Sequence, residues 1–352
     1  MAEENANQYG IEIRRLSKIF GADAAAMVRL VEEGITKAEL NERHGHVLGL
    51  RDIDISMPAG RIQVIMGLSG SGKSTLIRHI NRLIDPTAGE ILVGGEDVVK
   101  MSAKELREFR RHKTAMVFQK FALLPHRNVL ENTVYGLEIQ GVPRGAQVEA
   151  AMRWIERVGL AGFETHYPNQ LSGGMQQRVG LARALTNDAP ILLMDEAFSA
   201  LDPLIRTDMQ TVLLDIQKEI RKTIVFITHD LDEALRLGDR IAILRDGEVV
   251  QQGTSQDIVL RPADDYVENF VREVNRGRVV QVEAVMTPLA AGDAPAAPTV
   301  AAGTTVEDAM RLLVGGAQAE IVVVGPDGAA LGTVDLRQLA GATVNPRKAS
   351  DT

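Results

Sequence analysis

One octapeptide constrains the fold of this chain more than any other feature. Residues 67–74 read Gly-Leu-Ser-Gly-Ser-Gly-Lys-Ser and fit the pattern G-x-x-x-x-G-K-[ST]. The apolar run at 61–66 predicts a strand before this loop, and residues 74–84 predict a helix after it. In such a unit the glycines let successive backbone N–H groups turn inward around phosphate oxygens, and the helix presents its positive N-terminus to the same anion. The loop therefore predicts a nucleoside-triphosphate site.

Two side chains of this phosphate loop carry its chemistry. Lys73 would reach the β- and γ-phosphates, and the Ser74 hydroxyl would ligate Mg²⁺. A loop of this kind does not by itself separate kinases, GTPases and ATP-driven proteins. We expect nucleotide contacts from the whole loop and the residue after it, which are Gly67, Leu68, Ser69, Gly70, Ser71, Gly72, Lys73, Ser74 and Thr75.

A pair of acids after a second apolar run narrows the chemistry. Residues 191–194 are Ile-Leu-Leu-Met, and Asp195 and Glu196 follow them. Asp195, at the end of a buried strand, suits Mg²⁺ bound through water next to Ser74. Glu196 lies one residue further and could polarise the attacking water as a general base. The sequence has no Asn/Thr-Lys-x-Asp motif for reading guanine, so a GTPase is disfavoured.

Short apolar runs between helical stretches predict the fold class. Besides 61–66 and 191–194, such runs occur at 115–118, 223–227 and 241–244. They suit strands that are buried on both faces by covering helices. We therefore expect an α/β domain with a mostly parallel sheet.

The chain of 352 residues is long enough for two or three domains. A first strand is expected at 11–20, followed by a helical insert at 22–46. Within the insert, Thr36 and Glu39 form a capping box that opens a short helix. Near 281–303 the composition shifts to Ala and Pro, which marks a linker. These features divide the chain into a nucleotide-binding domain at 1–280, a small α+β domain at 281–345 and a tail at 346–352.

The overall composition disfavours several classes of protein. A net charge of −8 argues against general binding to nucleic acid. No apolar run approaches the length of about 18 residues that a membrane span needs, so we expect no direct insertion into lipid. The absence of cysteine excludes disulfides and thiolate metal sites. The N-terminal residues do not resemble a signal peptide, which favours an intracellular protein.

Residues 171–177, Leu-Ser-Gly-Gly-Met-Gln-Gln, resemble the signature motif of ABC-type ATPases. Three further motifs match this family in order: Gln119 as the Q-loop glutamine, residues 199–202 as the D-loop and His229 as the switch histidine. The resemblance implies a RecA-like core with antiparallel β and α-helical subdomains. It also implies a head-to-tail homodimer, in which the signature motif of one copy contacts the γ-phosphate of ATP held by the other.

The same resemblance implies roles for individual residues. Phe20 falls where the family keeps an aromatic side chain that stacks on adenine. The catalytic residues that it implies are Lys73, Gln119, Glu196 and His229. The metal ligands that it implies are Ser74, Gln119 and Asp195. Outside the phosphate loop, it implies nucleotide contacts for Phe20, Gln119, Leu171, Ser172, Gly173, Gly174, Gln177 and Asp202.

Three longer runs, at 64–91, 115–138 and 191–210, are similar to the ATPase subunits of glycine betaine/proline importers, as is the insert at 22–46. This similarity implies an ATP-hydrolysing subunit that powers import of osmoprotectants through a separate membrane permease. A substrate-binding protein is then an indirect partner. The chain is expected at the cytoplasmic face of the inner membrane, held there by the permease. Choline or another quaternary amine is the alternative cargo.

Two functions of other classes stay open. One is a soluble ABC ATPase that acts on nucleic acid or the ribosome, which the acidic charge disfavours. The other is a nucleotide-sensing regulatory protein, in which the C-terminal domain is the main functional part. The presence of both Glu196 and His229 speaks against this second alternative.

The segment after the Q-loop glutamine is apolar. Residues 118–126 read Phe-Gln-Lys-Phe-Ala-Leu-Leu-Pro-His. In the family this is where the permease docks, and an exposed apolar patch here would favour such a partner. Burial within the domain's own helical arm is the alternative.

The C-terminal domain departs from the family pattern. Residues 284–342 resemble a single CBS motif, where family members usually carry two that pair. One such half cannot bury its sheet face alone, so we expect it to pair with a neighbour or pack on the ATPase domain. Between residues 281 and 352, eight acids stand against four bases, which leaves no polybasic cluster for anionic lipid.

Overall fold

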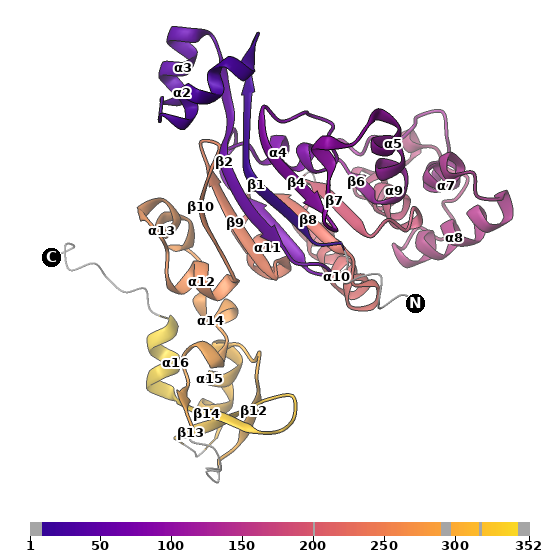
Figure 1. Ribbon diagram of the computed structural model, residues 1–352. Helices are drawn as coiled ribbons and strands as arrows, with labels where there is room; N and C mark the ends of the chain where they lie inside the picture. Colours follow the sequence, from indigo (N-terminus) through magenta and orange to yellow (C-terminus); the bar gives the residue numbers. More distant parts are fainter. Residues whose placement is uncertain (1–8, 200, 290–296, 317–318, 344–352) are drawn as a thin grey trace. The chain divides into compact units, whose positions relative to one another are not determined.

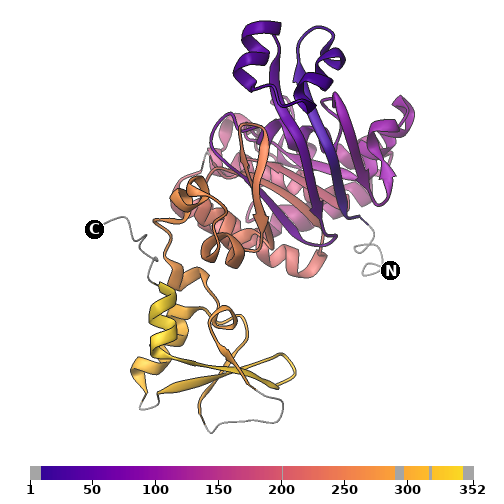
Figure 2. The same ribbon diagram turned by 60° about the vertical axis from the view of Figure 1, so that its left-hand side comes forward.

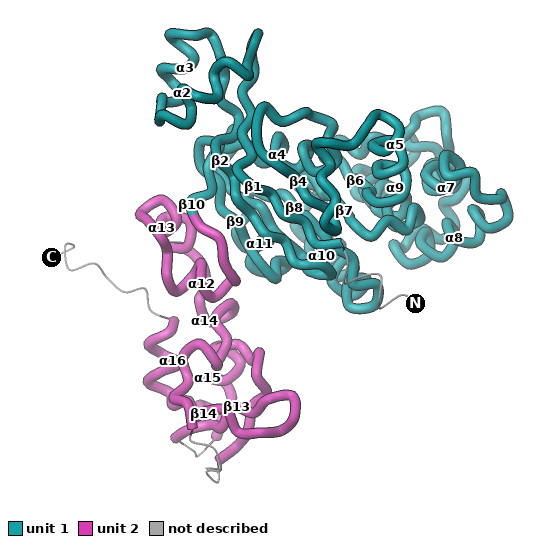
Figure 3. The backbone as a smooth tube through the Cα atoms, in the orientation of Figure 1, with its two compact units in different colours: residues 1–250 teal, residues 251–352 magenta. Residues whose placement is uncertain are grey.

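The structure is a computed structural model that describes residues 9–199, 201–289, 297–316 and 319–343. The chain forms two compact units, residues 1–250 and 251–352 (Figure 3). The division falls before the predicted boundary at residue 280, because α14 (Arg276–Val279) packs against α15 (Val306–Gly315) and α16 (Leu336–Thr343). The predicted tail at 346–352 lies outside the described residues. No helix in the described ranges is long and apolar enough to cross a membrane.

A six-stranded sheet with strand order β10-β9-β3-β8-β7-β6 contains the apolar runs of the sequence. β3 pairs in parallel with β8 and β9, and β7 pairs in parallel with β6 and β8. The predicted α/β domain with a mostly parallel sheet is therefore confirmed. The strands are β3 (Ile62–Met66), β6 (Thr114–Val117), β7 (Ile191–Asp195), β8 (Thr223–Thr228), β9 (Arg240–Arg245) and β10 (Glu248–Gly253).

An antiparallel sheet with strand order β2-β1-β4-β5 lies beside the parallel one (Figures 1 and 2). Helix α4 (Lys73–Ile80) contributes Leu76 and Ile77 to a fully buried core that also contains Ile13 and Ile55 of the antiparallel sheet and Leu193 of the parallel sheet. This shared core fixes α4, and with it the loop before α4, between the two sheets. The strands are β1 (Ile11–Phe20), β2 (Val47–Met57), β4 (Ala88–Val93) and β5 (Glu96–Asp97).

The predicted insert forms three short helices between β1 and β2, at the top of Figure 1. Its small core joins Val31 and Leu40 of the insert to Ile19 and Leu48 of the two strands. The predicted capping box is confirmed, since the Thr36 hydroxyl accepts from the Glu39 N–H at 3.2 Å and a Glu39 carboxylate oxygen accepts from the Thr36 N–H at 3.1 Å. The helices are η1 (Ala24–Met27), α2 (Val28–Glu32) and α3 (Lys37–His44).

A group of helices forms an arm on the side of the parallel sheet where β6 lies (Figure 1). In this helical arm, α6, α7 and α8 pack on α9. Two further helices, α10 and α11, follow β7 and β8. The helices of this unit besides α4 and the insert are η2 (Val98–Lys100), α5 (Ala103–His112), α6 (Val129–Thr133), α7 (Tyr135–Gln140), α8 (Arg144–Arg157), η3 (Pro168–Gln170), α9 (Gly173–Thr186), α10 (Pro203–Ile220) and α11 (Leu231–Leu237).

The second unit contains a mixed four-stranded sheet with strand order β11-β14-β13-β12. The predicted hairpin is present, because β13 and β14 pair antiparallel, and the predicted helix after the linker is α15. The α+β character agrees with the prediction, while the likeness to a CBS motif stays a prediction. The other elements are α12 (Ser255–Leu260), α13 (Asp265–Val271), η4 (Val282–Ala284), β11 (Thr287–Pro288), β12 (Thr299–Ala301), β13 (Glu320–Val324) and β14 (Ala330–Asp335).

Candidate active site

The phosphate loop joins β3 to α4, so it lies at the carboxyl end of an inner strand of the parallel sheet. Gly67 and Gly72 adopt φ values of +150° and +99°. A Cβ at Gly67 would lie 2.2 Å from the Leu244 carbonyl oxygen, and one at Gly72 would lie 2.9 Å from the Gly49 carbonyl oxygen. Glycine is thus required at both positions by backbone conformation and by close approach. The loop is held in place by neighbouring backbone.

Lys73, the first residue of α4, turns its buried side chain back into the loop. Its Nζ donates to the carbonyl oxygens of Gly67 at 2.9 Å and of Leu68 at 3.0 Å. Burial lowers the pKa of Lys73, and the carboxylates of Glu196 and Asp195 act in the opposite direction. The Lys73 ammonium group therefore lies inside the loop, at the position that the sequence predicts for phosphate.

Ser74 and Asp195 lie together, as the sequence predicts. The Ser74 hydroxyl donates to Asp195 Oδ1 at 2.7 Å, which links the start of α4 to the end of β7. The other carboxylate oxygen, Oδ2, accepts from Arg78 Nη2 at 3.2 Å. Sequence reasoning missed Arg78, although its position four residues after Ser74 places both on one face of the helix. Asp195 is buried, so the ion pair with Arg78 balances its charge in this state.

Glu196 is the point where three predicted catalytic residues converge. Gln119 Nε2 donates to Glu196 Oε2 at 3.0 Å, His229 Nδ1 lies 3.6 Å from the same oxygen, and Lys73 Nζ lies 3.9 Å from Oε1. These side chains come from the segment after β6, the end of β8 and the start of α4. The parallel sheet brings them together because the carboxyl ends of its strands share one edge.

The backbone of Glu196 is held in an unusual conformation. Its φ is +47°, which costs a non-glycine residue on the order of 1–3 kcal/mol. The Glu196 N–H donates to the Ile227 carbonyl oxygen at 3.2 Å, and the Ser199 hydroxyl donates to the Glu196 carbonyl oxygen at 2.9 Å. The neighbouring strand and the following turn therefore fix the carboxylate beside Lys73 and Gln119.

The signature motif lies at the start of α9, in the helical arm. Ser172 is the N-cap of this helix, and its hydroxyl accepts from the Met175 N–H at 3.3 Å. Ser172 and Gly173 are exposed to solvent. The sequence places both as nucleotide contacts, and the structure leaves them on the surface, available to a group from outside the chain.

Two residues of the same motif are placed differently from the prediction. Leu171 is buried, and Gln177 is 0% exposed with neither side-chain amide atom hydrogen-bonded. Gln177 follows Gly173 by four residues, one helical turn into α9, and its side chain lies in the interior. Both side chains are therefore buried, and the nucleotide contacts of these two residues stay predictions.

The remaining predicted contacts differ in their exposure. The Phe20 ring is 40% exposed at the end of β1, and Lys18 Nζ lies 5.0 Å from its centroid. Asp202 is exposed and caps α10, where its Oδ1 accepts from the Ile205 N–H at 3.0 Å. In the phosphate loop and the residue after it, Leu68, Ser69 and Gly70 are exposed, while Gly72, Ser74 and Thr75 are half-buried. Ser71 is buried, and its hydroxyl has no hydrogen-bond partner among the described residues.

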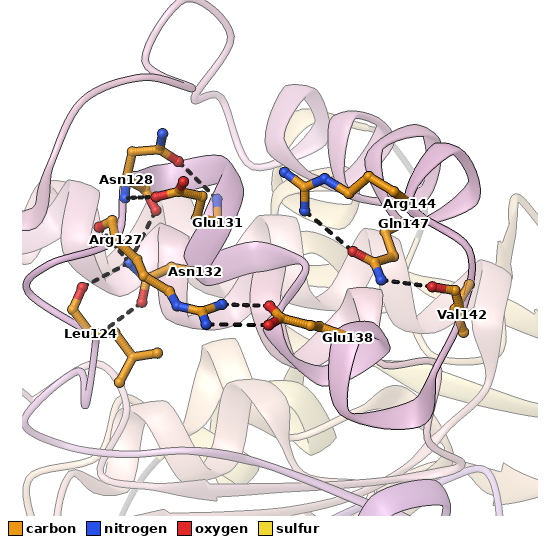
Figure 4. A network of polar contacts seen from close by, with 9 residues as sticks. All are labelled: Leu124, Arg127, Asn128, Glu131, Asn132, Glu138, Val142, Arg144 and Gln147. Carbon is orange, nitrogen blue, oxygen red and sulfur yellow. Dashed lines mark hydrogen bonds and ion pairs between the residues drawn. The ribbon is translucent and has the colours of Figure 1, made fainter.

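The apolar segment at 118–126 does not form the exposed patch that the sequence predicts. Phe121, Leu123 and Leu124 are each half-buried, whereas Gln119 is exposed. The buried Asn132 of α6 accepts from the Leu124 N–H at 2.8 Å and donates to its carbonyl oxygen at 3.1 Å (Figure 4). The helical arm therefore holds this segment, which is closer to the alternative expectation of burial within the arm.

Fold and site together define a P-loop nucleoside-triphosphate-binding protein, in which the two acids lie at the end of β7, a strand that β8 separates from the loop strand β3. A family model described as ABC transporter matches residues 50–199. The chain is 45% identical to the trimethylamine N-oxide transport system ATP-binding protein TmoW of Ruegeria pomeroyi, over 92% of this chain and 94% of that protein. The chain belongs to the ABC transporter family, among its ATP-binding proteins.

Higher identity is found over a shorter span. The glycine betaine transport ATP-binding protein OpuAA of Bacillus subtilis is 56% identical over 78% of this chain. The chain spans 66% of the length of that relative. Among solved structures, the dimeric structure of MJ0796, a bacterial ABC transporter cassette, superposes with a TM-score of 0.60 at 32% identity, over 69% of this chain and 98% of that one.

Proposed function

We propose that this chain is the ATP-hydrolysing subunit of an importer for osmoprotectants of the glycine betaine/proline type. The observation that carries the ATPase activity is the convergence of Gln119, Lys73 and His229 on Glu196, beside the phosphate loop. The cargo rests on the 56% identity to a glycine betaine transport protein. The relatives named above are all transport proteins, which favours this function over a soluble non-transport ATPase or a nucleotide-sensing regulator.

ATP binding uses the groups that now face inward in the loop. The phosphate oxygens replace the carbonyl oxygens of Gly67 and Leu68 as acceptors for Lys73 Nζ. The buried Ser71 hydroxyl, which has no hydrogen-bond partner among the described residues, offers one more donor at the loop. The exposed face of Phe20 is available to stack on adenine. We propose these residues as the nucleotide contacts of a single chain.

Mg²⁺ fits the oxygen atoms of Ser74 and Asp195. They lie 2.7 Å apart, and the described residues contain no cluster of three or more acidic or histidine side chains that could hold a metal alone. Two protein oxygens completed by phosphate and water are what Mg²⁺ usually takes in such proteins. Bound there, it would neutralise charge on the β- and γ-phosphates. The proposed third ligand, Gln119, is exposed and within reach of Glu196.

Hydrolysis rests on Glu196 and its neighbours. Glu196 takes the role of general base, which orients and polarises the water that attacks the γ-phosphate. The Gln119 amide holds one carboxylate oxygen at 3.0 Å, which leaves the rest of the carboxylate for that water. His229 is 56% exposed, so its ring is free to contact the charge that develops on the phosphate.

A second copy of the chain completes the proposed site. The N-terminus of α9, a helix of 14 residues, presents Ser172 and Gly173 to solvent rather than to the chain's own loop. A helix N-terminus of this kind attracts a phosphate. In a head-to-tail homodimer, each signature motif would close over the γ-phosphate held by the other copy. The similarity to a cassette solved as a dimer supports this arrangement.

Transport requires a separate permease, and the segment at 118–126 is the proposed contact. It contains Gln119, so movement of this residue at the γ-phosphate would reach the rest of the segment through the backbone. Asn132 of the helical arm holds Leu124 of this segment by two hydrogen bonds, while Asn128 and the Arg127–Glu138 ion pair bond other residues of the arm (Figure 4). The chain would then sit at the cytoplasmic face of the membrane through the permease, with the substrate-binding protein as an indirect partner.

A second cargo class is favoured by one comparison. The chain matches 94% of the length of the trimethylamine N-oxide transport protein of Ruegeria pomeroyi. It matches 66% of the length of the glycine betaine transport protein. Choline, trimethylamine N-oxide and glycine betaine all carry a methylated nitrogen. Import of another methylated amine by the same mechanism is therefore the alternative.

Uptake in cells tests the proposal. Radiolabelled glycine betaine, proline, choline and trimethylamine N-oxide are supplied to cells with the wild-type chain, Glu196→Gln or Lys73→Ala, at low and high osmolarity. Glu219→Gln, which changes an exposed acid paired with Arg157, is the matched control. Uptake of one solute that both site variants abolish and the control retains identifies the cargo. Unchanged uptake of all four solutes would overturn the importer.

A further inference from the structure

A single arginine joins two functional loops of the first unit. Arg206 lies in the first turn of α10 and is half-buried. Its Nη1 donates to Asp230 Oδ2 at 3.2 Å, while its Nη2 donates to the carbonyl oxygens of Leu201 at 3.1 Å and of Ser199 at 3.5 Å. Its Nε is buried and has no hydrogen-bond partner in the described part of the chain. One guanidinium thus ties the loop at 199–202 to the residue that follows His229.

Leu201 also contacts the chain's own signature motif. A Cβ built on Gly174 would lie 3.1 Å from Ile205 Cγ2 and 3.9 Å from Leu201 Cδ2. Gly174 therefore packs directly on the start of α10 and the residue whose carbonyl oxygen Arg206 binds. In the proposed dimer, this motif serves the nucleotide of the other copy. The loop at 199–202 therefore lies between the signature motif, which would contact the nucleotide of the other copy, and Glu196, which would act on the chain's own nucleotide.

The other end of this connection reaches Glu196. The Ser199 N–H donates to the Glu196 carbonyl oxygen at 3.2 Å, so the loop begins at the catalytic carboxylate's own backbone. Asp230 is also fixed, since its N–H donates to the Thr228 hydroxyl at 3.0 Å and its Oδ1 accepts from the Glu233 N–H at 3.2 Å. His229 lies between Thr228 and Asp230, so a displacement of Asp230 moves its ring relative to Glu196.

We propose that Arg206 is a positioning residue that couples the loop at 199–202 to His229. When the signature motif of a chain moves, Arg206 transmits the movement, so that the distance between Glu196 and His229 of the same chain changes as well. This inference rests on the proposed ATPase function. Arginine suits the role because its planar fork bonds several oxygen atoms at once, whereas lysine offers a single ammonium. The Asp230 carboxylate supplies the charge that makes one of these bonds strong.

Steady-state ATP hydrolysis by the purified full-length chain tests the coupling. The variants are Arg206→Gln, Asp230→Asn, the double variant and Arg206→Lys. Asp230→Asn retains the cap of α11, because asparagine caps helices as well as aspartate does, and it removes only the charge. Asp208→Asn is the control, since Asp208 lies on α10 and pairs with Arg178 without touching the loop. The active fraction of each preparation is counted by ATP-binding stoichiometry in a Glu196→Gln background.

We expect Arg206→Gln to lower kcat about tenfold with KM for ATP within about twofold of wild type, because positioning is lost in the transition state rather than in nucleotide binding. Asp230→Asn should also lower kcat. The kcat of the double variant should be no lower than that of Arg206→Gln, since both changes break the same connection. Arg206→Lys should be intermediate, because it keeps the charge for Asp230 and loses the fork.

The outcomes separate the inference from the function on which it rests. If Arg206→Gln matches Asp208→Asn in kcat, or if the two single changes add in the double variant, the coupling is overturned while the ATPase stands. If the loss disappears after normalisation to the active fraction, Arg206 is structural only and the coupling is again overturned. A wild-type chain that hydrolyses no more ATP than Glu196→Gln overturns the proposed function itself.

Discussion

The proposed nucleotide site has two halves, the phosphate loop with its neighbouring acids (the loop half) and the signature motif (the signature half). They differ in how complete they are within one chain. At the phosphate loop, Lys73, Ser74 and Asp195 already bind one another or the loop, and Gln119 holds Glu196. At the signature motif, Ser172 and Gly173 face solvent, and Ser172 bonds only its own helix among the interactions described. The first half is preorganised by the sheet, whereas the second is an exposed surface that a second chain would cover in the proposed dimer.

The difference between the halves predicts the largest effect, which is complementation between two inactive variants. Lys73→Ala destroys the loop half, and Ser172→Arg blocks the signature half with a bulky cation. Each should lose roughly 10²–10³-fold or more in ATP hydrolysis, since each removes preorganised groups at the phosphate. A mixture of the two should regain activity, because a mixed dimer contains one site with both halves intact. Phosphate release is measured for each variant and for the mixture.

The complementation has a matched control. Ser102 is the N-cap of α5, where its hydroxyl accepts from the Glu105 N–H as Ser172 accepts from that of Met175. Ser102→Arg makes the same change at a helix outside the site, and it should retain activity. If the mixture is as inactive as its components while Ser102→Arg is active, the two halves do not meet across copies.

Glu196→Gln sharpens the comparison by separating binding from chemistry. The loop half should still hold ATP through Lys73, while kcat falls by roughly 10²–10⁴-fold with the loss of the general base. The signature motif of the other copy then stays closed over unhydrolysed ATP. Size-exclusion chromatography with Mg·ATP should show a dimer for Glu196→Gln and a smaller dimer fraction for wild type. A monomer in both cases would contradict closure by ATP.

Acid stability tests how the helix that follows the phosphate loop is buried. His79 of α4 is fully buried, and burial lowers its pKa to about 4, while its Nδ1 bonds the Thr75 carbonyl oxygen. The folded state therefore keeps His79 neutral, and the unfolded chain takes up the proton at about pH 6.5. The free energy of unfolding should be fully maintained above pH 6.5 and fall by about 3 kcal/mol as pH drops to 4.

Denaturant unfolding across this pH range checks the prediction. His79→Asn should be less stable at neutral pH and should lose most of the dependence between pH 6.5 and 4. His126 is exposed, so His126→Asn should follow the wild-type curve. A wild-type curve that is flat across this window would show that burial of His79 does not control the acid response.

Sequence patterns predicted the loop half better than the signature half. Buried strands are short apolar runs, and Ser74 and Asp195 each follow such a run, so their meeting at one edge of a parallel sheet could be expected. The burial of Gln177 could not be read from the motif, because a motif does not state which side of a helix faces inward. Arg206 and Asp230 were missed because their elements meet only in the folded sheet, where no local spacing links them.

The smallest expected effect concerns Arg78, which holds Asp195 in the loop half. The ion pair at 3.2 Å occupies the carboxylate oxygen that Ser74 leaves free, so Arg78 competes with Mg²⁺ for the same group. Arg78 is substantially exposed, and such pairs contribute only about 0.2–1 kcal/mol. Arg78→Gln should therefore lower the Mg²⁺ concentration for half-maximal ATP hydrolysis by about two- to fivefold, with a small change in kcat.

Lys100→Gln, at an exposed pair outside the site, is the control for a general change in charge. A higher Mg²⁺ requirement in Arg78→Gln would instead mean that the arginine orients Asp195 for the metal, and the loop half would then be preorganised by attraction rather than by competition.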